Sequence, residues 1–226
     1  MVTCLLTQPQ PRVAALCEQV RAAGLAAVSL GFTSLELIEG AETELVSLDF
    51  ERFDRIVLVS PSAVWFAREA IDGMAKARRP RIAVIGAGTQ AALISQHPGV
   101  QPLKPSQPPY DAEHLAAMPE MQLAENQAML VVRADRGRED WIEQYRQLGV
   151  KMTVLALYRA RATNPTADAL QSLMKLAQAD AKALSVVSSV GLADRLLDWQ
   201  PDTALNDSTH GQVSISAWLR RQPVFV

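Results

Sequence analysis

The chain of 226 residues is 49% hydrophobic and 20% charged, which allows one large domain or two small ones with buried cores. A net charge of -2 excludes a general basic field and argues against nucleic acid as a partner. The two cysteines, Cys4 and Cys17, are too few for a disulfide framework or a zinc site, and as buried thiols they suit a reducing cytosol. No apolar stretch reaches the ~18 residues of a membrane helix, and the N-terminus lacks the features of a signal peptide. We therefore expect a cytoplasmic protein with no membrane partner.

The first 30 residues follow a strand–helix–strand pattern. Val2–Thr7 is an apolar run typical of a buried strand, and Arg12–Ala23 carries apolar residues three and four positions apart, which indicates one helix face. Gly24 is placed to end this helix before a second strand at Leu25–Leu30. The unit has the right length for a crossover between parallel strands.

The middle of the chain contains further strands and helices, with a clear helix start at Ser60-Pro61. Ser caps the first free N–H groups of a helix, and Pro suits the first helical position. Apolar runs predict strands at Leu35–Ile38, Arg55–Val59 and Arg81–Ile85. Helices are predicted at Asp49–Phe53, Ala63–Met74, Thr89–Ile94 and Asp111–Met118, with a proline-rich irregular stretch over Gln96–Tyr110.

From residue 128 onward the same alternation returns. Strands are predicted at Ala128–Arg133, Val150–Tyr158, Leu184–Val187 and Pro223–Val226. Helices are predicted through Trp141–Leu148, which Gly149 ends, and at Asn164–Ala179, Gly191–Leu197 and Ile215–Arg220, with a polar loop over Pro201–Gly211.

These elements form an internal repeat. Val2–Leu30 matches Ala128–Leu157, and Ile56–Ile71 matches Leu184–Leu197, the second pair with a Ser-containing cap between strand and helix. The third unit of one half is Arg81–Ile94, and its counterpart begins at the last residues of the chain. Generic strand–helix alternation would give a similar pattern without duplication. We predict an α/β fold of two similar domains with parallel sheets.

The expected site lies where the strands end, because open parallel sheets bind ligands beyond the carboxyl ends of their strands. Gly86, Gly88 and Thr89 follow a strand and open a helix, whose unpaired N–H groups favour anions. The same glycines fit a dinucleotide fingerprint, which also requires a carboxylate about 20 residues further on. The chain has Pro102–Pro109 there instead, so a tight turn that lets Thr89 touch a ligand is the alternative.

Serines at these strand ends either cap helices or hydrogen-bond a ligand carboxylate. They are Ser60, Ser62, Ser188 and Ser189. A Ser–His–Asp arrangement finds no support near the three histidines, which lie in loops or at a polar helix end.

A basic group at two strand ends consists of Arg133, Arg136, Arg138, Arg159 and Arg161. Its alternative interpretation is solvated surface, and Arg133 is the best candidate for the site because it directly follows a buried strand. Tyr158 ends a strand, where its phenol either donates a proton or covers the sheet edge. No residues have metal-ligand spacing, so we expect no metal and no organic cofactor.

The order of these segments resembles the uroporphyrinogen-III synthase family. Each motif alone is unspecific, but their joint order is specific and spans most of residues 1 to 200. The matching segments are Val59–Val64, Ile82–Leu93, Val131–Val150 with Ala156–Ala160, and Val186–Leu196.

The resemblance implies two flavodoxin-like domains joined by a two-stranded connector, with the active site in a cleft between them. One domain would comprise residues 1–33 and 162–226, and the other residues 38–158, with crossings near 32–39 and 158–163. The implied substrate is a polycarboxylate linear tetrapyrrole, hydroxymethylbilane. The implied reaction closes its ring with inversion of the last pyrrole through a spiro intermediate and without a cofactor. We expect a monomer.

The resemblance also implies roles for individual residues. Tyr158 matches the proton donor to the departing hydroxyl, and Ser60 and Thr89 match residues that contact the substrate. Eight carboxylates would be held by backbone N–H groups, hydroxyls and a few arginines. The predicted binding residues are Thr7, Ser60, Ser62, Gly86, Gly88, Thr89, Arg133, Arg138, Ser188 and Ser189.

Two departures from the family pattern affect these expectations. The first strand ends in Thr7-Gln8-Pro9 where the family has Thr-Arg-Pro, so one basic contact is missing. The family also continues beyond Val226 with a strand, a turn and a helix, so we expect a truncated or degenerate chain. The alternatives are a non-catalytic two-domain module that binds a small anion, and a nicotinamide-dependent enzyme.

Overall fold

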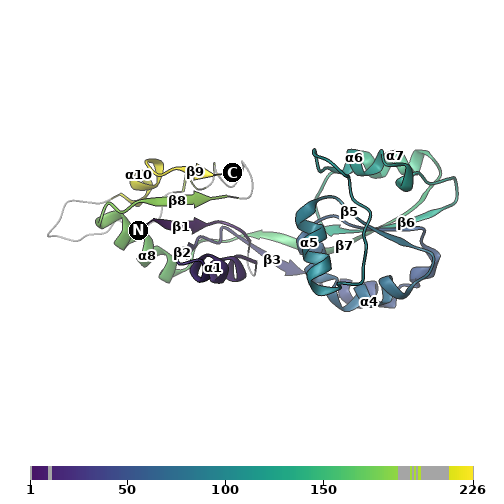
Figure 1. The fold of residues 1–226 in the computed structure, drawn as a ribbon, viewed down its shortest axis with the longest axis horizontal. Coiled ribbons are helices and arrows are strands. Elements are labelled where there is room, and N and C mark those ends of the chain that lie inside the picture. Colours follow the sequence, from purple (N-terminus) through teal and green to yellow (C-terminus); the bar gives the residue numbers. More distant parts are fainter. Residues whose placement is uncertain are drawn as a thin grey trace. The chain divides into compact units, whose positions relative to one another are not determined.

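A computed structural model describes residues 2–9, 12–187, 194, 196, 198–199 and 214–225. The chain divides into two compact units, one of residues 1–35 with 161–226 and one of residues 36–160. Each unit contains its own sheet with helices beside it (Figure 1). The predicted α/β class with parallel sheets is confirmed.

The first unit is built on a four-stranded parallel sheet in the order β2-β1-β8-β9. Leu5 faces a core that includes the fully buried Trp218, and the next residue, Leu6, faces the opposite core with Val13. This alternation is that of a strand buried on both faces. The elements are β1 (Thr3–Leu6), α1 (Arg12–Ala22), β2 (Ala26–Ser29), α8 (Ala167–Gln178), β8 (Ala183–Val186), α10 (Ile215–Arg220) and β9 (Val224–Phe225).

The second unit is built on a five-stranded sheet in the order β3-β7-β6-β4-β5. Its elements are β3 (Thr33–Leu37), α2 (Ala41–Ser47), η1 (Phe50–Arg52), β4 (Arg55–Leu58), α3 (Pro61–Phe66), α4 (Arg68–Lys76), β5 (Arg81–Val84), α5 (Ala87–Gln96), α6 (Ala112–Ala116), η2 (Pro119–Met121), β6 (Ala128–Ala134), α7 (Asp140–Gln147) and β7 (Lys151–Ala162). Helices α6 and α7 cover one face of the sheet, and α4 lies on the other (Figure 1).

The pairs β5–β4, β4–β6 and β6–β7 are parallel, whereas β3 runs antiparallel to its neighbour β7. The Ile38 N–H donates to the Leu157 carbonyl at 3.0 Å, and the Thr163 N–H donates to the Phe32 carbonyl at 3.0 Å. From the first residue pair to the second, the residue number falls on β3 and rises on β7, so the two strands are antiparallel. The chain passes from one unit to the other within these two strands.

The two sheets repeat one topology. The order β2-β1-β8-β9 corresponds to β7-β6-β4-β5, and in each sheet the first two of these strands are joined by a single helix, α1 or α7. Gly24 and Gly149 end these two helices with φ of 80° and 79°, in the left-handed region that glycine adopts without strain. The matching strand order supports the predicted repeat.

Several boundaries differ from the prediction. The predicted helix Ala63–Met74 is two helices, α3 and α4, because Ala67 leaves helical geometry with φ of -87° and ψ of 2°. Helix α2 lies where no helix was predicted, and β7 is 12 residues long, four residues beyond Tyr158. Most of the predicted helix Gly191–Leu197 and all of the loop Pro201–Gly211 lie outside the described residues.

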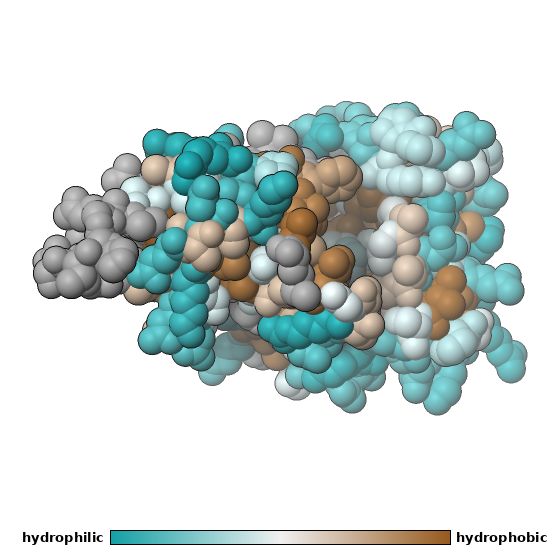
Figure 2. All heavy atoms as spheres, turned by 60° about the vertical axis from the view of Figure 1, so that its left-hand side comes forward, coloured by the Kyte–Doolittle hydropathy of each residue, from teal (hydrophilic) through white to brown (hydrophobic). Residues whose placement is uncertain are grey.

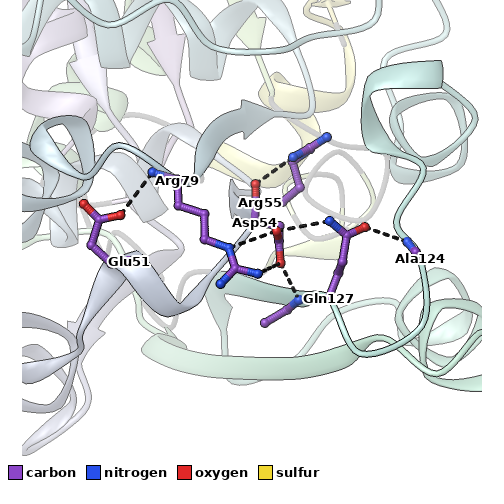
Figure 3. A network of polar contacts seen from close by, with 7 residues as sticks. Glu51, Asp54, Arg55, Arg79, Ala124 and Gln127 are labelled. Atoms are coloured by element: carbon purple, nitrogen blue, oxygen red, sulfur yellow. Dashed lines mark hydrogen bonds and ion pairs between the residues drawn. The ribbon is translucent and has the colours of Figure 1, made fainter.

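Asp54 centres a polar network at the amino ends of β4, β5 and β6 (Figure 3). Its carboxylate accepts two bonds from Arg79, at 3.0 and 3.1 Å, one from the Gln127 amide at 3.1 Å and one from the Ala128 N–H at 2.8 Å. Burial raises the pKa of Asp54, but the bonds from Ala128 and Arg79 outweigh it, so the pKa lies below its usual value. The network joins three strands at this edge.

Most of the surface drawn in Figure 2 is hydrophilic, and apolar side chains emerge in a few places. Isolated exposed apolar side chains are normal for a folded protein. Within the described residues, no helix is long and apolar enough to span a membrane.

Candidate active site

A cavity of about 260 Å³ lies in the second unit at the carboxyl ends of β4, β5, β6 and along β7. Its lining combines apolar side chains with arginines and one phenol. The lining residues are Val59, Ile85, Asp111, Ala112, Arg133, Ala134, Arg136, Gly137, Arg138, Trp141 and Tyr158. This is the edge at which parallel sheets bind ligands.

A larger cavity of about 570 Å³ lies at the other edge, around Lys76, Arg81 and His97. We place the candidate site at the smaller cavity for two reasons. The larger one adjoins the amino end of β5, and none of the described residues that line it has a hydroxyl side chain. The smaller one lies at the carboxyl ends of the strands and combines arginines and a phenol with apolar side chains, a composition usual for a ligand site.

Tyr158 and Ser60 meet beside the smaller cavity. The phenol oxygen lies 2.7 Å from Ser60 Oγ, and either atom can be the donor. Ser60 Oγ also accepts the Ala63 N–H at 3.0 Å as the N-cap of α3. The sequence predicted both residues for the site from different strands, and the fold brings their oxygens together.

A β-bulge in β7 sets the position of Tyr158. Arg133 lies opposite Ala156, but the next residue, Ala134, lies opposite Tyr158, so Leu157 is the extra residue. A bulge re-aims the side chains that follow it. Tyr158 is 6% exposed, and its ring stacks on Phe66, with centroids 5.0 Å apart and planes at 12°. Stacking and the Ser60 bond hold the phenol in one orientation.

The three arginines of the cavity differ in their ion-pair and hydrogen-bond partners. Arg138 pairs with Glu113 and lies 3.7 Å from Asp140. Arg133 is 8% exposed; it donates to the Arg138 carbonyl at 3.2 Å and pairs with Glu139.

Arg136 is exposed and has no ion pair among the described residues. The sequence placed Arg136 with the surface group rather than the site, and only the cavity distinguishes it from the other surface arginines. Trp141 in the cavity lining was predicted only as part of a helix.

Gly86 is the N-cap of α5, and Thr89 is 4% exposed in its first turn. Gly88 lies beside α3, since a Cβ on it would meet Pro61 at 3.8 Å. Ser62, in the first turn of α3, is 6% exposed. Gly86, Gly88 and Thr89 therefore lie near the start of α3, but they do not line the cavity; the residues before Gly86 and Ser60, Ile85 and Val59, do.

The predicted site residues of the first unit have a different placement. Thr7 is fully buried, and its hydroxyl donates to the Val186 carbonyl at 3.3 Å, within the sheet. The Thr7 hydroxyl therefore has a hydrogen-bond acceptor within the protein and needs no ligand. Ser188 and Ser189 lie outside the described residues.

The histidines that the structure describes pair with carboxylates and not with serines. His97 Nδ1 lies 2.9 Å from Asp72, and His114 Nδ1 lies 2.6 Å from Asp111. Bonds from the His114 N–H and ring lower the pKa of Asp111, which caps α6. In the part of the chain that is described, no group of His, Cys, Asp and Glu could hold a metal ion.

The family model described as uroporphyrinogen-III synthase HemD matches residues 14–217 of the chain. The chain therefore belongs to the uroporphyrinogen-III synthase family, a family of cyclising lyases in tetrapyrrole synthesis.

The chain is also similar to solved structures of two such enzymes at low identity. A mutant uroporphyrinogen III synthase from the extremely thermophilic bacterium Thermus thermophilus is 14% identical, with 83% of this chain and 73% of that chain covered and a TM-score of 0.47. The uroporphyrinogen-III synthetase from Helicobacter pylori is 12% identical, with 90% and 80% covered and a TM-score of 0.47.

Proposed function

We propose that this protein converts the linear tetrapyrrole hydroxymethylbilane into the ring with an inverted last pyrrole, through a spiro intermediate. The observation that carries the proposal is the bond of 2.7 Å between Tyr158 and Ser60 beside an apolar cavity with arginines in its lining. Family membership supports the reaction class and does not favour the alternative of a non-catalytic anion-binding module.

The size and lining of the cavity suit one ring of such a substrate. Its volume of about 260 Å³ is just below the range of roughly 300–1,000 Å³ that pockets for drug-sized ligands occupy. A single pyrrole can lie against Val59, Ile85 and Trp141, with its carboxylate side chains directed to Arg133 and Arg136. We propose that this cavity holds one pyrrole and that other residues bind the remaining rings.

Tyr158 is the proposed proton donor. The reaction must break the bond between carbon and the terminal hydroxyl, and that hydroxyl leaves as water once it receives a proton. The pyrrole nitrogen supplies the electrons, so no metal or redox step is required. With Ser60 donating to the phenol oxygen, the phenol O–H is directed to the departing hydroxyl. The proton lost when the new ring regains aromaticity restores the phenol. A positioned acid of this kind contributes about 10²–10⁴-fold in rate.

The other predicted contacts of the second unit, Arg138 among them, are proposed as binding groups, whereas Thr7 is left out because its hydroxyl bonds within the sheet. Ser60, Ser62 and Thr89 supply hydroxyls, and the turn Gly86–Gly88 supplies N–H groups at the start of α5. Helix starts favour carboxylates because their N–H groups lack intrahelical acceptors and the helix dipole is positive there. The expected roles of Ser188 and Ser189 stay predictions. So do the monomeric state and the cytoplasmic location.

The two compact units are proposed to be the two domains expected from the repeat. Their division after residue 35 and after residue 160 lies within three residues of the domain limits expected from the family. Strands β3 and β7 would then form the two-stranded connector.

The test is to incubate the protein with hydroxymethylbilane generated in the same vessel by its own synthase. The products are then oxidised and their ring isomers separated by chromatography. We expect the isomer with the inverted ring to form in proportion to the amount of protein. If only the non-inverted ring appears, at the rate seen without protein, the proposed activity is wrong for this chain.

A further inference from the structure

Arg133 has an unused hydrogen-bond donor inside the cavity wall. Its side chain is 10% exposed, and Nη1 and Nη2 donate to the Arg138 carbonyl and the Glu139 carboxylate, respectively. The third nitrogen, Nε, is buried and has no hydrogen-bond partner among the residues that the structure describes. An unpaired buried donor costs free energy, more so on a charged group. Nε can therefore donate one further hydrogen bond.

The missing partner has a defined chemistry. The Nε–H and one Nη2–H of an arginine point the same way and form a fork that matches the two oxygens of a carboxylate. Arg79 uses this fork fully, since its Nε and Nη2 bind the two oxygens of Asp54 at 3.0 and 3.1 Å. Arg133 uses half of the same fork, because Glu139 bonds Nη2 alone.

Glu139 is poorly placed to be a permanent partner. Its side chain is 54% exposed, and it directly precedes α7 at the end of the turn Asp135–Arg138. This turn covers the guanidinium, since a Cβ added at Gly137 would be in van der Waals contact with Arg133 Nη1, at 3.4 Å. Glu139 occupies Nη2, so another carboxylate can bind Nε and Nη2 together only when Glu139 leaves.

We propose that Glu139 is a placeholder that occupies Arg133 in the free protein and is displaced by a carboxylate of the substrate. The inference rests on the proposed function and names Arg133 as the receptor of one substrate side chain. Exchanging Glu139 for a substrate carboxylate replaces a single hydrogen bond by a bidentate pair and gives Nε an acceptor. It also keeps the buried guanidinium beside a negative charge in both states, which avoids the large cost of an unpaired buried charge.

The test compares Glu139→Gln with Glu143→Gln. Glu143 lies on α7, its side chain is also 54% exposed, and it pairs with Arg146 at 3.4 Å, away from the cavity. Both substitutions remove one negative charge, so any general electrostatic effect is shared. The probe is a monopyrrole with one acetate and one propionate side chain, titrated by calorimetry. Because the Glu139 side chain is half exposed and solvent weakens its attraction to Arg133, we expect Glu139→Gln to bind the probe about fivefold more tightly. We expect Glu143→Gln to bind it as the wild type does.

A second measurement separates displacement from an indirect effect. Arg133→Lys keeps the charge and removes the fork, so adding Glu139→Gln to Arg133→Lys should no longer strengthen binding. In the wild type, the ¹⁵N–¹H signal of Arg133 Nε, assigned by its loss in Arg133→Lys, should shift and exchange more slowly with solvent as the monopyrrole is added.

Equal affinities of the Glu139→Gln, Glu143→Gln and wild-type proteins would overturn the placeholder role. An unchanged Arg133 Nε signal at saturation would do the same. These results are independent of turnover. If Glu139→Gln binds the probe more tightly but the wild type closes no ring, the placeholder role stands and the proposed reaction is wrong. If the wild type closes the ring but Glu139→Gln binds no more tightly, only the placeholder role is wrong.

Discussion

Arg79 and Arg133 lie at opposite edges of one sheet and differ in how many of their hydrogen-bond donors have acceptors. At the amino edge, Asp54 receives four hydrogen bonds, two of them from the Arg79 fork (Figure 3). At the carboxyl edge, Arg133 has a bare Nε and an exposed partner, and Tyr158 and Ser60 share a bond whose direction is open. A network that is complete without a ligand stabilises the fold, whereas one that lacks a partner has capacity for a ligand. Changes at the amino edge should therefore alter stability, and changes at the carboxyl edge should alter activity.

The largest expected effect is that of Tyr158→Phe on turnover. Removing the proposed proton donor should lower kcat about 10²-fold or more, because positioned acids contribute about 10²–10⁴-fold. Tyr145→Phe is the matched control, since the Tyr145 hydroxyl donates to the Met121 carbonyl at 2.9 Å within the core under α7. It should cost about 1 kcal/mol in stability and leave kcat unchanged. Equal turnover of Tyr158→Phe and wild type would remove the proton-donor role.

Asp54→Asn should have the largest effect on stability. It removes the charge that holds Arg79, and breaking a buried pair costs about 3–5 kcal/mol. Because the Arg79 side chain is 51% exposed, we expect a smaller loss of about 2 kcal/mol. Urea unfolding measures this loss, and kcat of the folded variant should be unchanged. A fall in kcat without a loss of stability would contradict the assignment of the two edges.

Ser60→Ala should lower kcat about tenfold, because the phenol of Tyr158 loses its partner, and should lower stability by about 1 kcal/mol through loss of the N-cap. Ser214→Ala is the control, since Ser214 caps α10, another six-residue helix, and accepts the Ala217 N–H at 3.2 Å. The two variants should lose similar stability, and only Ser60→Ala should lose activity. If Ser60→Ala and Ser214→Ala have equal kcat values, Ser60 only caps α3 and has no role in catalysis.

The smallest expected effect is the pH dependence of the Asp54 contribution. The folded pKa of Asp54 lies below its usual value of 3.8, so its contribution is complete above the pKa of the unfolded chain and is lost as the pH falls through the folded pKa. The difference in unfolding free energy between wild type and Asp54→Asn should therefore be constant from pH 7 to about pH 5 and shrink below about pH 4. A difference that grows on acidification would show that the carboxylate is not the stabilising form.

Much of the fold could be read from local patterns. The runs around Leu5 and Val57 are apolar because parallel strands are buried on both faces, and Gly24 and Gly149 end helices because they adopt positive φ. Ser60 as a cap was equally visible, since the pair Ser60-Pro61 is a local signal. The break at Ala67 and the helix α2 carried no comparable signal, and only packing decides them.

The sequence by itself determined the class of the fold, its repeat and the strand ends at which Ser60, Arg133 and Tyr158 lie, because these depend on residues near one another in the chain. The tertiary structure alone decided that Tyr158 meets Ser60, 98 positions away in the chain, through a bulge that no local pattern reveals. It also decided that the fork of Arg79 is complete while that of Arg133 is half used. Whether an arginine stabilises a fold or awaits a ligand depends on which carboxylates reach it, and that depends on how distant segments pack.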